Sequence, residues 1–137
     1  MADLSQVPTI LCVDDDLSFL RILKEYFTNL GFSVLTVTNG EAAVAQVTRR
    51  PPNAVILDLF MHGLDGVGTL QQIRRLNPRI PVIVVSGVSN AVEMLQQAAV
   101  SVASVFLKPV DPDQILKALL LVGVAPPKPG PSAGRGA

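Results

Sequence analysis

The stretch VILDLFMHGLDG, residues 55 to 66, places a lone carboxylate, Asp58, directly after an apolar run. A short apolar run that is rich in β-branched residues and bounded by turn residues is typical of a buried strand. Burying a charged group costs free energy unless the group is paired or binds a metal ion. We therefore expect Asp58 to follow a buried strand and to be held there by another charged group or by a cation.

Four further apolar runs alternate with segments in which apolar residues recur at helical spacing. Strands that are apolar throughout and separated by helices predict a parallel sheet with helices on both faces. The sequence therefore predicts an α/β fold, a doubly wound sheet built from five strand–helix units. The predicted strands are residues 9–13, 32–37, 54–59, 80–86 and 104–107.

Polar caps and glycines predict where the helices begin and end. Asp16 is expected to cap the first helix and Gly31 to end it. Asn90, with Glu93 three residues later, matches a capping box, and Asp111 is a cap followed by proline. The inward face of the first helix is predicted to consist of Phe19, Ile22, Leu23, Tyr26, Phe27 and Leu30.

Composition limits the class of protein. Of the 137 residues 49% are apolar, which suffices for one domain with a core. The formal net charge is zero, which argues against direct nucleic-acid binding through bulk charge. Cys12 is the only cysteine, so no disulfide framework exists, and we expect it to be a core residue. The sequence has neither an apolar stretch of membrane-spanning length nor a signal-peptide pattern, so we expect a cytoplasmic protein without membrane contact.

The expected organisation is an N-terminal extension over residues 1–6, one domain over residues 7–123 and a tail over residues 124–137. The tail is rich in Pro, Gly and Ala and has no apolar periodicity, which is typical of a flexible terminus or linker.

Ligands of open α/β sheets bind at the carboxyl ends of the strands, so the residues predicted there define the candidate site. These residues combine a cluster of acids with one hydroxyl and one ammonium group. They are Asp14, Asp15 and Asp16 after the first strand, Asp58 after the third, Ser86 after the fourth and Lys108 after the fifth.

Clustered carboxylates repel one another unless a cation intervenes. Oxygen ligands favour a hard divalent ion, and Mg²⁺ suits a site of one or two carboxylates, waters and phosphate. Lys108 and Ser86 would then contact phosphoryl oxygens. A carboxylate can itself act as nucleophile and yield an aspartyl phosphate, and Asp58, the lone acid on its strand, is best placed for that role.

Four motifs at these strand ends resemble the receiver domain of two-component response regulators, over residues 7–123. They are ILCVDDD (10–16), VILDLFMHGLDG (55–66), VIVVSG (82–87) and FLKPV (106–110). Each motif alone is weak, but all four in this order and at this spacing are specific. The resemblance implies a flavodoxin-like sheet with strand order 2-1-3-4-5.

The resemblance also implies roles for the site residues. Asp58 would accept a phosphoryl group from a phosphohistidine of a sensor histidine kinase or a histidine phosphotransfer protein. Mg²⁺ would be bound by Asp15, Asp58 and the backbone carbonyl of Phe60, with Asp14 helping directly or through water. Lys108 would pair with the phosphoryl group and precede a cis proline, and Ser86 would hydrogen-bond the phosphoryl group. Such a protein is a signalling phosphoacceptor rather than an enzyme.

The sequence departs from the family pattern at several positions. His62 replaces a usual proline, and Val105 replaces a usual aromatic residue, while the neighbouring Phe106 should point to the opposite face of its strand. Phe60 and Val88 are apolar at the positions that flank the hydrolytic water in the family, which predicts slow self-dephosphorylation.

The face formed by residues 88–122 is expected to bind an effector protein or a second copy of the chain. Between Val88 and Leu107 only Glu93 is charged, and an apolar surface tends to mark a partner site.

Two other functions remain open at this point. The segment VDDDLS (13–18) loosely fits the start of haloacid-dehalogenase-like phosphatases, with Asp14 as the nucleophile, although that role leaves Asp58 unexplained. The other alternative is a pseudo-receiver, a scaffold that never carries phosphate, which Val105, Phe60 and Val88 favour mildly. Asp65 is expected to serve only as a turn and helix cap.

Overall fold

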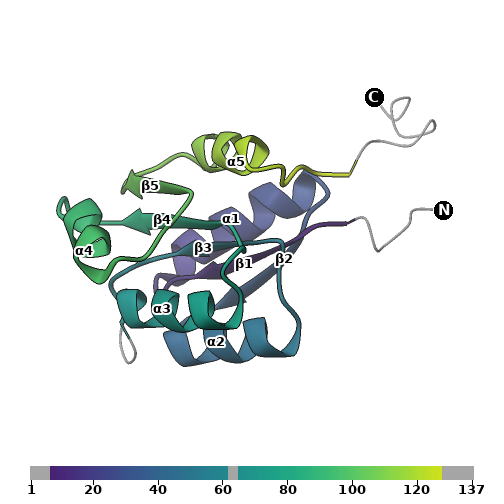
Figure 1. Cartoon of the computed structure of the whole chain (residues 1–137). Helices are drawn as coiled ribbons and strands as arrows, with labels where there is room; N and C mark the ends of the chain where they lie inside the picture. Colours follow the sequence, from purple (N-terminus) through teal and green to yellow (C-terminus); the bar gives the residue numbers. More distant parts are fainter. Residues whose placement is uncertain (1–6, 62–64, 128–137) are drawn as a thin grey trace, which may run out of the picture.

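The computed structural model describes residues 7–61 and 65–127, and within them five strands and five helices alternate (Figure 1). The strands form one sheet in the order β2-β1-β3-β4-β5, and every neighbouring pair is parallel. The predicted flavodoxin-like α/β fold is therefore confirmed. The elements are β1 (Thr9–Val13), α1 (Leu17–Asn29), β2 (Ser33–Val37), α2 (Gly40–Arg49), β3 (Ala54–Leu57), α3 (Gly66–Leu76), β4 (Val82–Ser86), α4 (Ala91–Ala98), β5 (Ser104–Leu107) and α5 (Pro112–Leu121).

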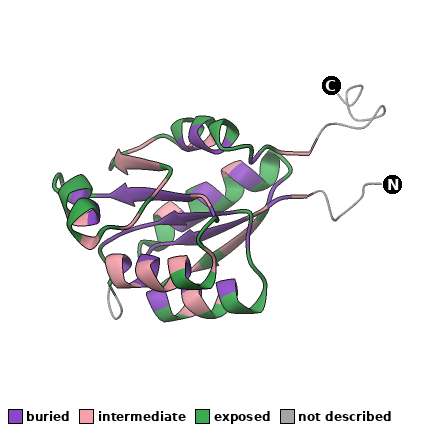
Figure 2. Ribbon diagram, viewed as in Figure 1, coloured by how far each residue is buried: buried purple, intermediate pink, exposed green. Residues whose placement is uncertain are grey.

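Two apolar layers hold the sheet between its helices, because successive side chains of a strand point to opposite faces (Figures 1 and 2). On β1, Ile10 and Cys12 pack with α1 and α5, whereas Leu11 and Val13 pack with α2, α3 and α4. Cys12 is completely buried, and this burial raises the pKa of its thiol to about 12, so it stays protonated and serves as a core residue, as predicted.

Parallel strands bring their carboxyl ends to one edge of the sheet, and two backbone hydrogen bonds continue the ladder past the strands themselves. The N–H of Asp14 donates to the carbonyl of Val37, and the N–H of Asp58 donates to the carbonyl of Val13. These bonds fix the backbone of both acids at the edge where the sequence predicts the site.

The inward face of α1 differs from the predicted one. Leu20, Leu23 and Phe27 are the buried residues of this helix, whereas Ile22 is 53% exposed. Each helical residue advances by about 100°, so Ile22 lies about 100° from Leu23, outside the buried arc. Leu30, which is 38% exposed, follows the last helical residue and so does not share the helix face.

The helix boundaries mostly follow the predicted caps. Asp16 accepts hydrogen bonds from the N–H groups of Ser18 and Phe19 at the start of α1. The capping box predicted at Asn90 is wrong, because the Asn90 side chain makes no capping hydrogen bond. Helix α4 also ends on a strained residue, since Ala99 adopts φ 55°, a left-handed conformation that favours glycine.

Arg74 of α3 holds the segment that follows α4 through hydrogen bonds to a backbone carbonyl. Its Nε and Nη2 donate to the carbonyl of Ser101 at 3.0 and 2.9 Å, and its Nη1 donates to the carbonyl of Ile80 at 2.6 Å. These hydrogen bonds join α3 to the segment that follows α4 and to the segment that precedes β4.

Packing continues past Gly123, because Val124 is only 8% exposed and belongs to the α1–α5 core. Residues 1–6, most of the predicted tail and His62 lie outside the described residues, so the domain boundaries stay a prediction. Among the residues that the structure describes, no helix is long and apolar enough to cross a membrane.

Candidate functional site

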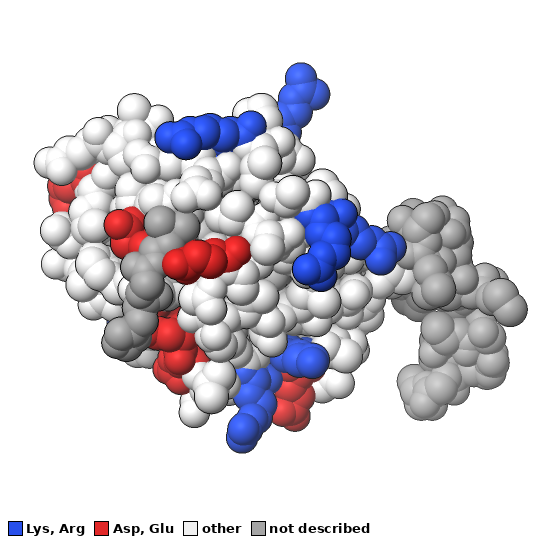
Figure 3. Space-filling model, turned by 90° about the horizontal axis from the view of Figure 1, so that it is seen from below, with Lys and Arg blue, Asp and Glu red and all other residues white. Residues whose placement is uncertain are grey.

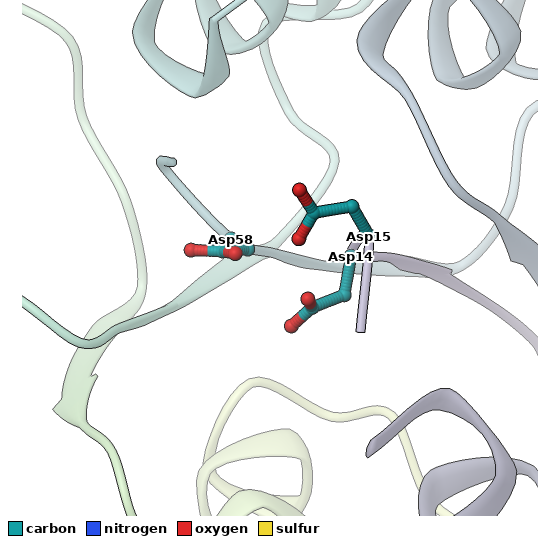
Figure 4. A group of neighbouring side chains, drawn as sticks. All are labelled: Asp14, Asp15 and Asp58. Atoms are coloured by element: carbon teal, nitrogen blue, oxygen red, sulfur yellow. The ribbon is translucent and has the colours of Figure 1, made fainter. Parts of the chain in front are cut away.

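Three carboxylates meet at the carboxyl edge of the sheet, as the strand order requires. Asp14 and Asp15 follow β1, and Asp58 follows the neighbouring β3 (Figure 4). One oxygen of each residue lies within 4.8 Å of the corresponding oxygens of the other two. Asp14 and Asp58 are buried, whereas Asp15 is exposed, so the cluster opens to solvent on the side of Asp15.

Lys108 is the charged group that faces Asp58. It follows β5, and its N–H donates to the carbonyl of Ser86 on β4. Its ammonium group donates a hydrogen bond of 2.7 Å to Asp14 Oδ2 and lies 3.8 Å from Asp58 Oδ2. A single cation therefore faces both buried acids, and the Lys108–Pro109 peptide is cis, as the resemblance implied.

Backbone N–H groups hold the remaining oxygen of each buried acid. Asp14 Oδ1 accepts from the N–H of Asp16 at 2.9 Å, and Asp58 Oδ1 accepts from the N–H of Phe60 at 3.1 Å. Both carboxylates are thus fixed through Oδ1 and turn Oδ2 toward Lys108. This leaves Asp58 Oδ2 at an ion-pair distance but without a hydrogen bond to the ammonium.

Burial raises the pKa of Asp58 to about 6. The N–H of Phe60 and the charge of Lys108 oppose this shift, while the charges of Asp14 and Asp15 add to it. For Lys108, burial alone would lower the pKa, but the hydrogen bond and charge of Asp14, together with Asp58 and Asp16, outweigh burial and raise it. At neutral pH the site therefore holds a charged ammonium beside a mostly ionised Asp58.

The donor set fits a hard divalent cation. Oxygens of all three carboxylates lie close together, and oxygen donors are the ligands that Mg²⁺ and Ca²⁺ select. On the face shown in Figure 3, most Asp and Glu side chains lie toward the side of the molecule at which the strands end.

Ser86 ends β4 at the same edge and is completely buried. Its Oγ accepts a hydrogen bond of 3.2 Å from the N–H of Val88. A hydroxyl group that accepts one hydrogen bond keeps its own proton to donate, so Ser86 remains a possible donor to an anion.

Val105 and Phe106 of β5 point to opposite faces of the sheet, as expected. Val105 packs with the α2–α3–α4 layer, and Phe106 packs with the α1–α5 layer. Phe106 therefore does not substitute for an aromatic residue at position 105.

Gly66 has a role that the sequence analysis did not find. Asp65 caps α3, as predicted, by accepting a hydrogen bond from the N–H of Gly68. A Cβ atom on Gly66, however, would lie 2.2 Å from the Cα of Leu59 and 2.5 Å from the carbonyl oxygen of Asp58. Only glycine lets α3 approach the backbone that carries Asp58, and no local sequence pattern separates this role from that of an ordinary turn glycine.

We predict that Asp58→Asn stabilises the fold in a pH-dependent way without Mg²⁺. The pKa of Asp58 is 3.8 in the unfolded chain and about 6 in the folded chain, so between these pH values the folded chain binds more protons. The stability that protonated Asp58 contributes is therefore complete below pH 3.8 and is lost as the pH rises to about 6. The neutral amide avoids that loss. With solvent screening allowed for, the gain should be about 1 kcal/mol near pH 8 and close to zero near pH 4.

Urea unfolding of both proteins at the two pH values measures this difference. Glu25→Gln on the exposed side of α1 is the matched control, for which we expect a change below about 0.5 kcal/mol at either pH. A gain for Asp58→Asn that persisted unchanged near pH 4 would contradict the stated cause.

Comparison with known proteins gives a consistent result. The family model described as the response regulator receiver domain matches residues 10–120. The transcriptional regulatory protein ZraR of Salmonella typhimurium is 36% identical over 113 residues, which cover 80% of this chain and 25% of ZraR. The chain thus spans about a quarter of the length of that relative.

Solved structures agree with the fold. NtrX from Brucella abortus is 27% identical with a TM-score of 0.75, and the match covers 85% of this chain and 28% of that one. A receiver domain protein from Methanospirillum hungatei has a TM-score of 0.78 at 22% identity, covering 85% and 93% of the two chains. With the family model matching most of its length, this chain belongs to the response regulator receiver domain family.

Proposed function

We propose that Asp58 is the residue of this receiver domain that accepts the phosphoryl group. The observation that carries the proposal is the position of the Asp58 carboxylate, which is buried, held through Oδ1 by the N–H of Phe60, and turned with Oδ2 toward Lys108. A pKa of about 6 leaves this carboxylate largely ionised at neutral pH, so an oxygen is available to attack phosphorus.

In the transfer, an Asp58 oxygen forms a bond to phosphorus while the bond from phosphorus to the imidazole nitrogen of the donor histidine breaks. Lys108 lies where its ammonium can contact an oxygen of the incoming group, and Ser86 retains a hydroxyl proton to donate to another. Phosphoryl transfer depends on this positioning and charge neutralisation more than on covalent chemistry by other residues.

We also propose that the acidic cluster binds Mg²⁺. Asp15, Asp58 and the carbonyl of Phe60 would be the ligands, with Asp14 direct or through water. The close approach of the carboxylate oxygens supports this set. When bound, the ion supplies charge neutralisation for the acids and the phosphoryl oxygens.

The phosphatase alternative is not favoured. It requires Asp14 as the nucleophile, but both oxygens of Asp14 are engaged, by Lys108 and by the N–H of Asp16, and the residue is only 2% exposed. The pseudo-receiver alternative is not favoured either, since Asp14, Asp15, Asp58 and Lys108 come together at one edge of the sheet.

We propose that the phosphodonor is a sensor histidine kinase or a histidine phosphotransfer protein and that the domain works in the cytoplasm. The output would pass through an effector, which in relatives such as ZraR belongs to a protein named as a transcriptional regulator. Direct nucleic-acid contact by this domain is not part of the proposal, because its formal net charge is zero.

Phosphorylation by acetyl phosphate with Mg²⁺, followed by intact-protein mass, tests the role of Asp58. We expect one added phosphoryl group on the wild type, none on Asp58→Ala, and none without Mg²⁺. Glu25→Gln, which removes the charge of an exposed acid on α1, is the matched control and should still be labelled. Label that survived in Asp58→Ala but vanished in Asp14→Ala would support the phosphatase instead.

The lifetime of the phosphorylated protein should be long, on the scale of hours rather than seconds. Phe60 is 44% exposed and Val88 is half-buried, and neither side chain can hydrogen-bond a water molecule for attack on phosphorus. We expect Phe60→Asn to shorten the lifetime, measured by the decay of the added mass after the donor is removed. A wild-type half-life of seconds would show that these residues do not limit hydrolysis.

The face of residues 88–122 is our proposed surface for an effector or a second copy. Its large exposed apolar side chains are Val92 on α4, Leu107 on β5, Leu120 and Leu121 on α5, and Val122 directly after α5. Met94 is only half-exposed, because it lines a cavity of about 730 Å³ with Phe60 and Met61. These five exposed residues therefore mark the proposed surface better than Met94 does.

We expect the phosphorylated wild type to associate in solution and Leu107→Glu to remain monomeric, as measured by sedimentation velocity. Ile22→Glu adds the same charge at an exposed apolar position on α1 and should leave the association unchanged. If the phosphorylated wild type also stays monomeric, this surface does not bind a second copy, and an effector remains as its proposed partner.

A further inference from the structure

The ammonium group of Lys108 has a third neighbour besides the two buried acids. It lies 4.8 Å from the centroid of the Phe19 ring and over the ring face. An ammonium group within about 6 Å of a ring centroid is attracted by the electron-rich face of the ring. Phe19 belongs to none of the motifs that identify the site, and its helical spacing predicts only that it lies on the inward face of α1.

The Phe19 ring is itself held firmly. The N–H of Phe19 donates to Asp16 Oδ1, which anchors the residue in the capped first turn of α1. The side chain is half-buried and packs against the α1–α5 core. A half-buried ring in a capped helix turn is a rigid platform, whereas a lysine has four rotatable side-chain bonds and loses rotamer freedom when its ammonium group is held in one place.

Asp14 is the acid that holds Lys108 most closely. The Lys108 side chain is 25% exposed, and it makes one hydrogen bond, to Asp14, with Asp58 farther away. If the cluster holds Mg²⁺, Asp14 would also face that cation, and its attraction for the ammonium group would then be weaker. The ring face is not shared with a cation, so its pull on the ammonium does not depend on the charge state of the cluster.

We infer that Phe19 is a positioning residue, whose ring keeps the Lys108 ammonium beside Asp58 for contact with the incoming phosphoryl group. The inference rests on the proposed phosphoacceptor role of Asp58. It extends the site from the sheet edge to the first turn of α1 and gives that turn a part in phosphoryl transfer.

Three variants separate attraction by the ring from simple packing. Phe19→Leu keeps an apolar side chain and removes the ring, whereas Phe19→Tyr keeps the ring. Tyr26→Leu is the matched control, because Tyr26 lies on the same helix and packs against the same core but contacts Phe27 rather than Lys108.

The first readout is the proton resonance of the Lys108 ε-methylene group, which the ring should shift upfield. The chain has only four lysines, so comparison with Lys108→Arg assigns it. We expect the upfield shift in the wild type, Phe19→Tyr and Tyr26→Leu, with or without Mg²⁺, and its loss in Phe19→Leu. An unshifted wild-type resonance would overturn the inference.

The second readout is the rate of phosphorylation by acetyl phosphate with Mg²⁺. We expect Phe19→Leu to be slower by about threefold, and Phe19→Tyr and Tyr26→Leu to match the wild type. Equal rates for Phe19→Leu and wild type, or equal losses in Phe19→Leu and Phe19→Tyr, would overturn the inference. If the wild type took no label at all, the proposed function would fail, and the resonance alone would decide whether Phe19 holds Lys108.

Discussion

The hydrogen bond from Lys108 to Asp14 is the interaction on which the site depends. It joins the end of the edge strand β5 to the end of β1, across the ends of β3 and β4 that lie between them. Asp58 lies on this path, so the same ammonium that satisfies Asp14 also faces Asp58 at ion-pair distance. The sheet order therefore sets the positions from which Lys108 reaches both acids.

Burying the ionised Asp58 costs folding free energy, and packing in the rest of the fold offsets that cost. Burial raises the pKa of Asp58, which shows that its ionised form is disfavoured where the fold places it. Two apolar layers, one on each face of the sheet, supply the stability that permits this unfavourable charge. If both oxygens of Asp58 were hydrogen-bonded, its ionised form would be more stable, but neither oxygen would be as free to attack phosphorus. The absence of a hydrogen bond between Asp58 Oδ2 and Lys108 therefore suits the role that we propose for Asp58.

The sequence predicted those features that local patterns determine. The strands were found because they are apolar throughout, and the caps at Asp16 and Asp65 because a capping side chain bonds N–H groups two or three residues away. The pairing of Lys108 with Asp14 was not predicted in detail, since strand order places residues at one edge but does not choose partners. Gly66 and Phe19 were missed for the same reason, because their contacts join residues that no local pattern links.

The start of α4 is where the site meets the proposed output face. The usual aromatic residue is absent at Val105, and Phe106 packs against the opposite side of the sheet. The contact that does join the site to this region is the hydrogen bond from the N–H of Val88 to Ser86 Oγ, two residues before Asn90, which makes no side-chain cap. A shift of the Ser86 hydroxyl toward a phosphoryl oxygen would act on this bond first. Because α4 begins without a side-chain cap, such a shift would meet no side-chain hydrogen bond at the start of this helix.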